Sequence, residues 1–93
     1  MRVITVHLLI QGRVQGVGFR AWVVREAAIR GLAGWVRNRR SGEVETVLCG
    51  DDASVRAMAQ ACHEGPRLAR VDRVELASHP HEAWTGFEVR PDV

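Results

Sequence analysis

The sequence predicts an α+β fold in which two helices cover one face of a mostly antiparallel, five-stranded sheet. Three observations predict it: apolar, β-branched runs that suit strands, two segments with apolar residues at helical spacing, and glycine-containing breaks between them. The chain has 93 residues, which fits a single domain over residues 1–93. This length excludes a doubly wound dinucleotide fold and a TIM barrel.

The first half of the chain is expected to run strand, helix, strand, strand. Residues 3–10 carry apolar side chains at both odd and even positions, as in a central strand. Residues 11–18 are expected to form a glycine-containing loop. Residues 19–31 carry apolar side chains every three or four positions, which predicts a helix that ends at its glycine. Residues 34–39 and 43–49 are expected to be two strands joined by a short hairpin turn.

The second half adds a helix and two strands. Residues 51–54 offer N-cap oxygens, and Gly65 before a proline is a helix stop. The apolar stripe between them consists of Val55, Met58, Ala59 and Cys62. Residues 71–76 predict a strand, residues 78–86 a turn-rich stretch, and residues 87–90 a short last strand. The order β-α-β-β-α-β, plus one strand, is the split βαβ or ferredoxin-like arrangement.

Arginine supplies the whole positive charge of the chain. All 13 basic residues are arginine, the net charge is +2 and the pI is about 9.0. The absence of lysine excludes a P-loop lysine and a Schiff-base enzyme. A guanidinium is planar and suits two-pronged contact with phosphate or carboxylate. The basic pI also keeps nucleic acid open as a partner.

The cysteines and the hydropathy pattern predict a cytoplasmic location. Cys49 and Cys62 carry no metal-binding or redox spacing. The apolar run 3–10 is interrupted by Thr5 and His7 and lacks a small-residue cleavage site, unlike a signal peptide. No segment approaches the roughly 20 apolar residues of a membrane span.

The glycine-containing segment before the first helix is the candidate binding site. Gly16 and Gly18 tolerate positive φ, so successive backbone N–H groups can converge at the helix N-terminus. Such a loop is an anion cradle sized for phosphate or sulfate, and Arg20 can close over the anion. The alternative is a tight turn with a solvated Arg20. A match to the dinucleotide pattern G-x-G-x-x-A is weak, because Asn38 stands where an acidic residue is required.

Asn38 is the second candidate, near the end of the strand after the first helix. An amide can accept from and donate to one water at once, so it can hold a nucleophilic water beside a cradled phosphorus. The alternative is an asparagine that merely begins the following turn.

Two motifs together resemble the acylphosphatase family: GRVQGVGFR at residues 12–20 and GWVRNRRSGEVE at residues 34–45. The resemblance covers nearly the whole chain and implies hydrolysis of the carboxyl–phosphate bond of acyl phosphates. It matches the phosphate-binding arginine to Arg20 and the water-orienting asparagine to Asn38. It assigns the cradle to the loop amides of Gln15, Gly16, Val17, Gly18, Phe19 and Arg20.

Two positions depart from the family pattern. Gly18 stands where a bulkier residue is common, which is expected to loosen the cradle slightly while leaving its amides intact. Ser41 replaces the usual Asp or Asn before the hairpin glycine, which affects the turn and leaves the chemistry unchanged.

The predicted chemistry needs no metal and no cofactor. An acyl phosphate expels a carboxylate, whose conjugate acid has a pKa of only about 4, so the leaving group needs no protonation. Arg20 and the loop amides supply the positive environment, and a water fixed by Asn38 attacks directly. The water's proton is expected to pass to a phosphate oxygen.

Three alternatives compete with this prediction. His79 and His81 could chelate a metal, although no further ligand stands at suitable spacing. A non-catalytic module binding an anion or RNA is the second, although the central strands lack the exposed aromatics that RNA recognition uses. A carbamoyl-phosphate-binding regulator is the third. We expect a monomer that acts on a small acyl phosphate and binds neither nucleic acid nor membrane, with the arginines of 37–40 as a steering field or a solvated face.

Overall fold

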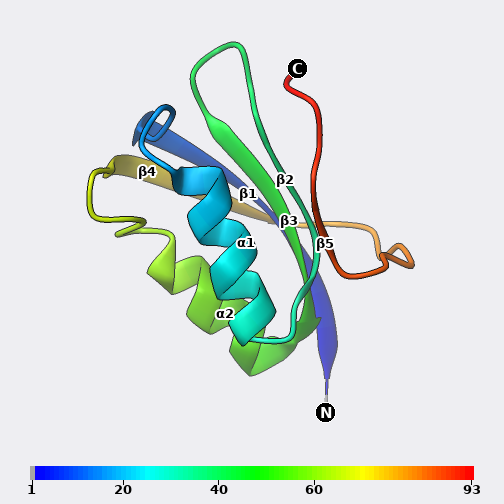
Figure 1. Cartoon of the computed structure of the whole chain (residues 1–93). Coiled ribbons are helices and arrows are strands. Elements are labelled where there is room, and N and C mark those ends of the chain that lie inside the picture. Colours follow the sequence, from blue (N-terminus) through cyan, green and yellow to red (C-terminus); the bar gives the residue numbers. More distant parts are fainter. Residues whose placement is uncertain (1) are drawn as a thin grey trace.

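The computed structural model describes residues 2–93, which form two helices and a five-stranded sheet (Figure 1). In chain order the elements are β1 (Val3–Arg13), α1 (Phe19–Ile29), β2 (Ala33–Asn38), β3 (Val44–Asp51), α2 (Asp52–Ala61), β4 (Arg70–Ser78) and β5 (Phe87–Val89). The strands lie in the order β4-β1-β3-β2-β5, and both helices cover the same face. The predicted ferredoxin-like α+β fold is confirmed.

The strand pairing places the two candidate motifs at one edge of the sheet. β3 runs antiparallel to both β1 and β2, so β1 and β2 point in the same direction on either side of it. Val44 pairs with Ile10 on one side and with Asn38 on the other. The loop that follows β1 and the end of β2 therefore meet at the same edge, where α1 begins. β5 pairs with β2 in parallel, which makes the sheet mixed.

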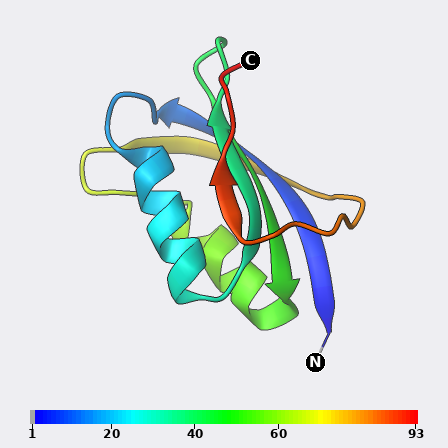
Figure 2. The same ribbon diagram turned by 45° about the vertical axis from the view of Figure 1, so that its right-hand side comes forward.

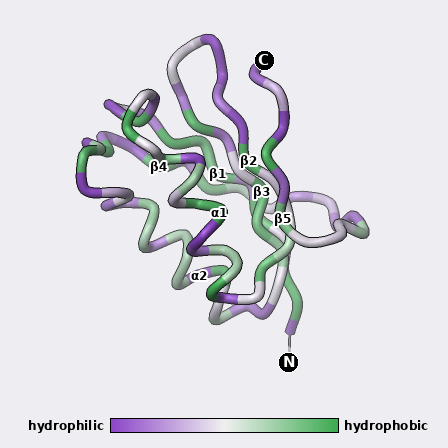
Figure 3. The backbone as a smooth tube through the Cα atoms, in the orientation of Figure 1, coloured by the Kyte–Doolittle hydropathy of each residue, from purple (hydrophilic) through white to green (hydrophobic). Residues whose placement is uncertain are grey.

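The core lies between the helices and the sheet. The predicted stripe of α2 is buried, with Val55, Met58 and Cys62 fully inaccessible. From α1 the buried residues are Phe19, Val23 and Ala27. Apolar residues run along the central strands and the helices, whereas the hairpin between β2 and β3 is largely hydrophilic (Figure 3). The polar hairpin therefore projects from a closely packed apolar core.

Several element boundaries differ from the predicted ones: α2, for example, ends at Ala61 and not at Gly65. The end of β1 is the boundary that lies at the candidate site. Residues 11–18 were expected to form a loop, but β1 continues to Arg13 and the loop covers only residues 14–18. The register with β4 shifts between Gln11 and Gly12, which is the signature of a bulge. Gly12 has φ +131°, and a Cβ there would lie 2.2 Å from the Arg70 carbonyl oxygen. This glycine thus permits close strand packing and has no part in the turn itself.

The start of α2 differs from the prediction in its capping. Asp51 occupies the N-cap position, as the sequence suggested, but its side chain makes no capping hydrogen bond. Asp52 instead pairs with Arg56 one turn further along the helix. The acidic residue in the first turn still favours the helix through its charge.

The sheet face opposite the helices is partly covered by the segment between β4 and β5. His79 stacks on His7 of β1 with ring centroids 6.0 Å apart, and both His79 and His81 lie against Trp84. His81 Nδ1 lies 3.5 Å from the Cys49 Sγ atom of β3. Within residues 2–93, no helix is long and apolar enough to cross a membrane.

Candidate functional site

The loop between β1 and α1 has the conformation that its glycines predict. Gly16 and Gly18 adopt φ of +72° and +81°, in the left-handed region that favours glycine. Gly18 is the N-cap residue of α1, and no side chain caps the helix. A Cβ at either glycine would meet no atom within 4 Å, so backbone conformation alone favours glycine here. Gly18, where the sequence departs from the family pattern, thus has a backbone conformation that suits glycine.

The start of α1 presents free hydrogen-bond donors. Among the hydrogen bonds formed within residues 2–93, none uses the backbone N–H groups of residues 16–21, and the first helical bond runs from Trp22 N to Gly18 O. The first turn of α1 holds no acidic residue. The positive end of the helix dipole is therefore uncompensated and can receive an anion.

A cavity of about 320 Å³ opens at this helix end. The loop, the first turn of α1, the end of β2 and β5 all contribute to its wall. Its lining residues are Val14, Gln15, Gly16, Gly18, Phe19, Arg20, Ala21, Asn38 and Val89. The structure thus brings together six of the seven residues singled out by the sequence. Val17 does not line the cavity and packs, half-buried, against the core.

Asn38 faces the loop from the last position of β2. Its side chain shares the helix side of the sheet with Val36, and only 8% of the residue is exposed. The Oδ1 atom is buried and has no hydrogen-bond partner within residues 2–93. A buried polar atom without a partner is costly, so it marks a place where a ligand or water completes the structure. The alternative reading of Asn38 as a mere turn starter does not account for this atom.

Arg20 stands at the mouth of the cavity with its side chain 42% exposed. Its Nη1 atom lies 3.4 Å from Asp92 Oδ1. The C-terminal residues reach this point because they continue alongside β2, with Val93 N donating to Asn38 O at 3.2 Å (Figure 2). Sequence reasoning missed Asp92 and Val89, since neither belongs to a motif and only the fold brings them to the site. It also gave no role to Ala21, which lines the cavity beside Arg20.

Two predicted cradle residues point their side chains elsewhere. The Phe19 ring is buried in the core, and a Cβ at Gly65 would lie 2.5 Å from its Cε2 atom. Gln15 donates its side-chain amide to the hairpin between β2 and β3. These two residues can serve an anion only through their backbone, which is what the family resemblance assigned to them.

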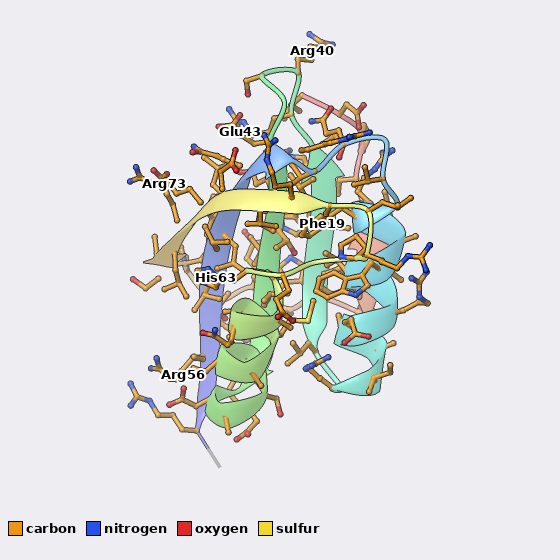
Figure 4. The ribbon with its side chains drawn as sticks, turned by 90° about the vertical axis from the view of Figure 1, so that its left-hand side faces the viewer. Phe19, Arg40, Glu43, Arg56, His63 and Arg73 are labelled. Carbon is orange, nitrogen blue, oxygen red and sulfur yellow. The ribbon has the colours of Figure 1, made fainter. Side chains whose placement is uncertain are left out.

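Two of the arginines in residues 37–40 form ion pairs on the sheet face opposite the helices. Arg37 Nε and His7 Nε2 each lie 2.6 Å from the Glu45 carboxylate, and Arg39 Nη1 lies 3.4 Å from it. Burial raises the pKa of Glu45, but the hydrogen bonds from His7 and Arg37 outweigh it and hold the pKa below its ordinary value. Arg40 extends from the tip of the hairpin (Figure 4).

The tryptophan of β2 on the sheet face opposite the helices is buried. Trp35 is the aromatic residue of β2 on this face, and it is only 5% exposed. The guanidinium carbons of Arg37 and Arg90 each lie 4.7 Å from its ring centroid, one cation from β2 and one from the segment after β5. The module that the sequence left open as an alternative stacks bases on exposed aromatics, and this tryptophan is unavailable for that.

Fold and site together define a class of protein: a small ferredoxin-like α+β domain whose first helix presents free N–H groups and an arginine to a buried amide. The acylphosphatase family model matches residues 6–89. The chain belongs to the acylphosphatase family, and it is a hydrolase of acyl phosphates.

Individual relatives agree with this assignment. The chain is 55% identical over 91 residues to an acylphosphatase of Azorhizobium caulinodans, covering 96% of this chain and 97% of that protein. The solved acylphosphatase of Coxiella burnetii superposes with a TM-score of 0.92 at 36% identity, covering 95% of this chain and 93% of that one. The acylphosphatase of Bacillus subtilis gives 0.89 at 33% identity, with coverage of 96% and 99%.

Proposed function

We propose that this acylphosphatase cleaves the carboxyl–phosphate bond by direct attack of a water held by Asn38 on a phosphoryl group bound by Arg20 and the loop amides. The observation that carries the proposal is the buried, unpartnered Oδ1 atom of Asn38, which lines the same cavity as the loop and Arg20. An acceptor placed beside a cluster of unused donors can orient a water toward an anion that the donors hold.

Phosphate binding is assigned to the loop and the first turn of α1. The free N–H groups of residues 16–21 and the guanidinium of Arg20 supply positive charge around the cavity. In phosphoryl transfer the rate depends mainly on positioning and on stabilising charge on the equatorial oxygens. Preorganised donors do both, since they need no reorganisation when the transition state forms. Inorganic phosphate or sulfate is expected to occupy the same cavity.

The leaving group and the nucleophile make modest demands on the protein. The departing carboxylate is stable without a proton, because its conjugate acid has a pKa of about 4. A loose transition state requires little nucleophilic strength, so a positioned water suffices and its proton passes to a phosphate oxygen. Asn38 therefore acts by orientation alone, and neither a side-chain base nor a metal ion enters the proposed mechanism.

The test is hydrolysis of benzoyl phosphate by wild type, Arg20→Ala and Asn38→Ala, with a chelator present throughout. Arg20→Ala is expected to abolish both phosphate binding and turnover. Asn38→Ala is expected to lower kcat about 10²- to 10³-fold while the inhibition constant of inorganic phosphate changes little.

Arg25→Ala is the matched control, because Arg25 is exposed on the same helix and does not line the cavity. It is expected to keep wild-type kinetics. Normal kcat in Asn38→Ala would remove the water-positioning role, and inhibition of the wild type by the chelator would remove the metal-independent mechanism.

We further propose that the chain acts as a one-domain monomer in the cytoplasm. Both cysteines are free and buried, which suits a reducing compartment. The exposed large apolar residues are spread over several elements: Val3, Ile29, Leu68, Leu76, Val89 and Val93. Sedimentation equilibrium at micromolar concentration tests the monomer, and a stable dimer would contradict it.

A further inference from the structure

The side chain of Gln15 connects the cradle loop to the hairpin that carries Asn38. Its Nε2 atom donates to Arg39 O at 2.7 Å and to Glu43 O at 2.8 Å. An amide nitrogen has two protons, so both are engaged by these carbonyls. The nitrogen of this side chain is therefore unavailable to a bound phosphate, although the residue lines the cavity.

The two carbonyls that accept from Gln15 close the hairpin. Arg39 N donates to Glu43 O at 2.9 Å, and Gly42 N donates to Arg39 O at 2.9 Å. Arg39 directly follows Asn38, and Glu43 directly precedes the residue that pairs with Asn38. The amide of Gln15 thus binds the backbone on both sides of the hairpin turn: at Arg39, which follows Asn38, and at Glu43 on the opposite side.

No other hydrogen bond within residues 2–93 joins the loop, residues 14–18, to residues 38–44. The ladder between β1 and β3 ends where Ile10 pairs with Val44, before the loop begins. β1 then continues in contact with β4, on the far side from the hairpin. The Gln15 side chain therefore supplies the hydrogen bonds that join loop and hairpin here, beside the packing of Val14 and Val17 against the core.

We infer that Gln15 is a positioning residue, which sets the place of the Asn38 amide relative to the cradle by fixing the hairpin to the loop. The inference rests on the proposed function, in which Asn38 orients the attacking water. In-line attack tolerates little displacement, and a shift of about 1 Å can cost on the order of 10²-fold in rate. Phosphate binding tolerates a displacement of Asn38, because the loop amides and Arg20 that bind phosphate belong to the loop and the first turn of α1, not to the hairpin.

The experiment compares Gln15→Met with wild type, using kcat for benzoyl phosphate and inhibition by inorganic phosphate. Methionine keeps the length of the side chain and removes both donors. We expect kcat to fall about 10- to 100-fold while the inhibition constant changes less than about threefold. Gln11→Met is the matched control, because Gln11 lies in β1 and does not line the cavity. It is expected to leave kcat unchanged.

A double-mutant cycle separates positioning from the other roles. In the Asn38→Ala background, Gln15→Met is expected to lower kcat less than about threefold further, because no amide remains to be placed. Full additivity of the two substitutions, or a large rise in the phosphate inhibition constant, would overturn the inference. If Gln15→Met does not fold, Gln15→Asn keeps the amide, shortens its reach by one methylene, and is judged by the same outcomes.

The same data separate this inference from the proposed function. Loss of activity in Asn38→Ala with normal kcat in Gln15→Met would remove only the positioning role. Normal kcat in Asn38→Ala would remove the water-holding role on which it depends.

Discussion

Replacing Glu45 by glutamine tests whether the pairing of Arg37 and Arg39 with this carboxylate stabilises the fold. The carboxylate of Glu45 is 8% exposed and lies 2.6 Å from both Arg37 Nε and His7 Nε2. Hydrogen bonds to a charged group contribute about 1.5–3 kcal/mol each, and the partial exposure of both partners places these at the lower end. A glutamine retains one acceptor oxygen, so we expect a net loss of about 2 kcal/mol in the free energy of unfolding at pH 7.

The loss should depend on pH with a definite sign. The folded protein holds the pKa of Glu45 below its ordinary value of 4.5, so the carboxylate stabilises the fold above that pH. This contribution disappears as pH falls through the lowered pKa, where the wild-type carboxyl becomes protonated and resembles glutamine. The difference between wild type and Glu45→Gln should therefore be full at neutral pH and shrink below pH 4.5.

Urea unfolding followed by tryptophan fluorescence over a range of pH measures the effect. For a domain of this size a loss of 2 kcal/mol corresponds to a fall in Tm of roughly 8–16 °C. Glu75→Gln is the control, because Glu75 is a 46% exposed partner of Arg73 in the same sheet and is expected to change stability by less than about 1 kcal/mol. Equal effects of the two substitutions, or a loss independent of pH, would refute the reasoning.

Further predictions concern packing, the thiol and the mouth of the site. Gly34→Ala should lower the free energy of unfolding in urea by about 2–4 kcal/mol, since its Cβ would lie 1.9 Å from a β3 carbonyl oxygen. Gly42→Ala, whose Cβ would meet open space, should lower it clearly less. Burial raises the pKa of Cys62 to about 12, so iodoacetamide at pH 8 should label it about a thousandfold more slowly in the folded than in the unfolded chain, and similar rates by peptide mass mapping would contradict this. Asp92→Asn should lower KM for benzoyl phosphate up to about fivefold at unchanged kcat, because substrate no longer competes with the carboxylate for Arg20; a raised KM would mean that the aspartate holds the arginine in place.

Local patterns in the sequence were sufficient for the fold class, and they singled out residues that line one cavity in the structure. The helical stripe of α2, the order of strands and helices, and the glycines before α1 are local features, and each is confirmed. Arg20 and Asn38 belong to two motifs at a family-typical separation, so the resemblance could assign them before any contact was known. Their catalytic roles stay proposals until the kinetics are measured.

Tertiary structure decided what the local patterns could not contain. The bulge at Gly12 extended β1 because β4 approaches its backbone, and that approach is set by a strand some sixty residues later in the chain, which pairs at Arg70. The arginines of residues 37–40 were expected to be a steering field or a solvated face. In the structure Arg37 of β2 and Arg39, which follows β2, pair with Glu45 of the neighbouring strand on the sheet face opposite the helices.

The sequence by itself determined which groups could bind phosphate and hold water, because backbone conformation at glycine and side-chain chemistry are properties of single residues. Only the tertiary structure decided how those groups are connected. The hydrogen bonds from Gln15 to the hairpin and the approach of Asp92 to Arg20 join residues 24 or more positions apart. Pairing at that separation depends on sheet register and chain path, which packing of the whole domain fixes and no local pattern records.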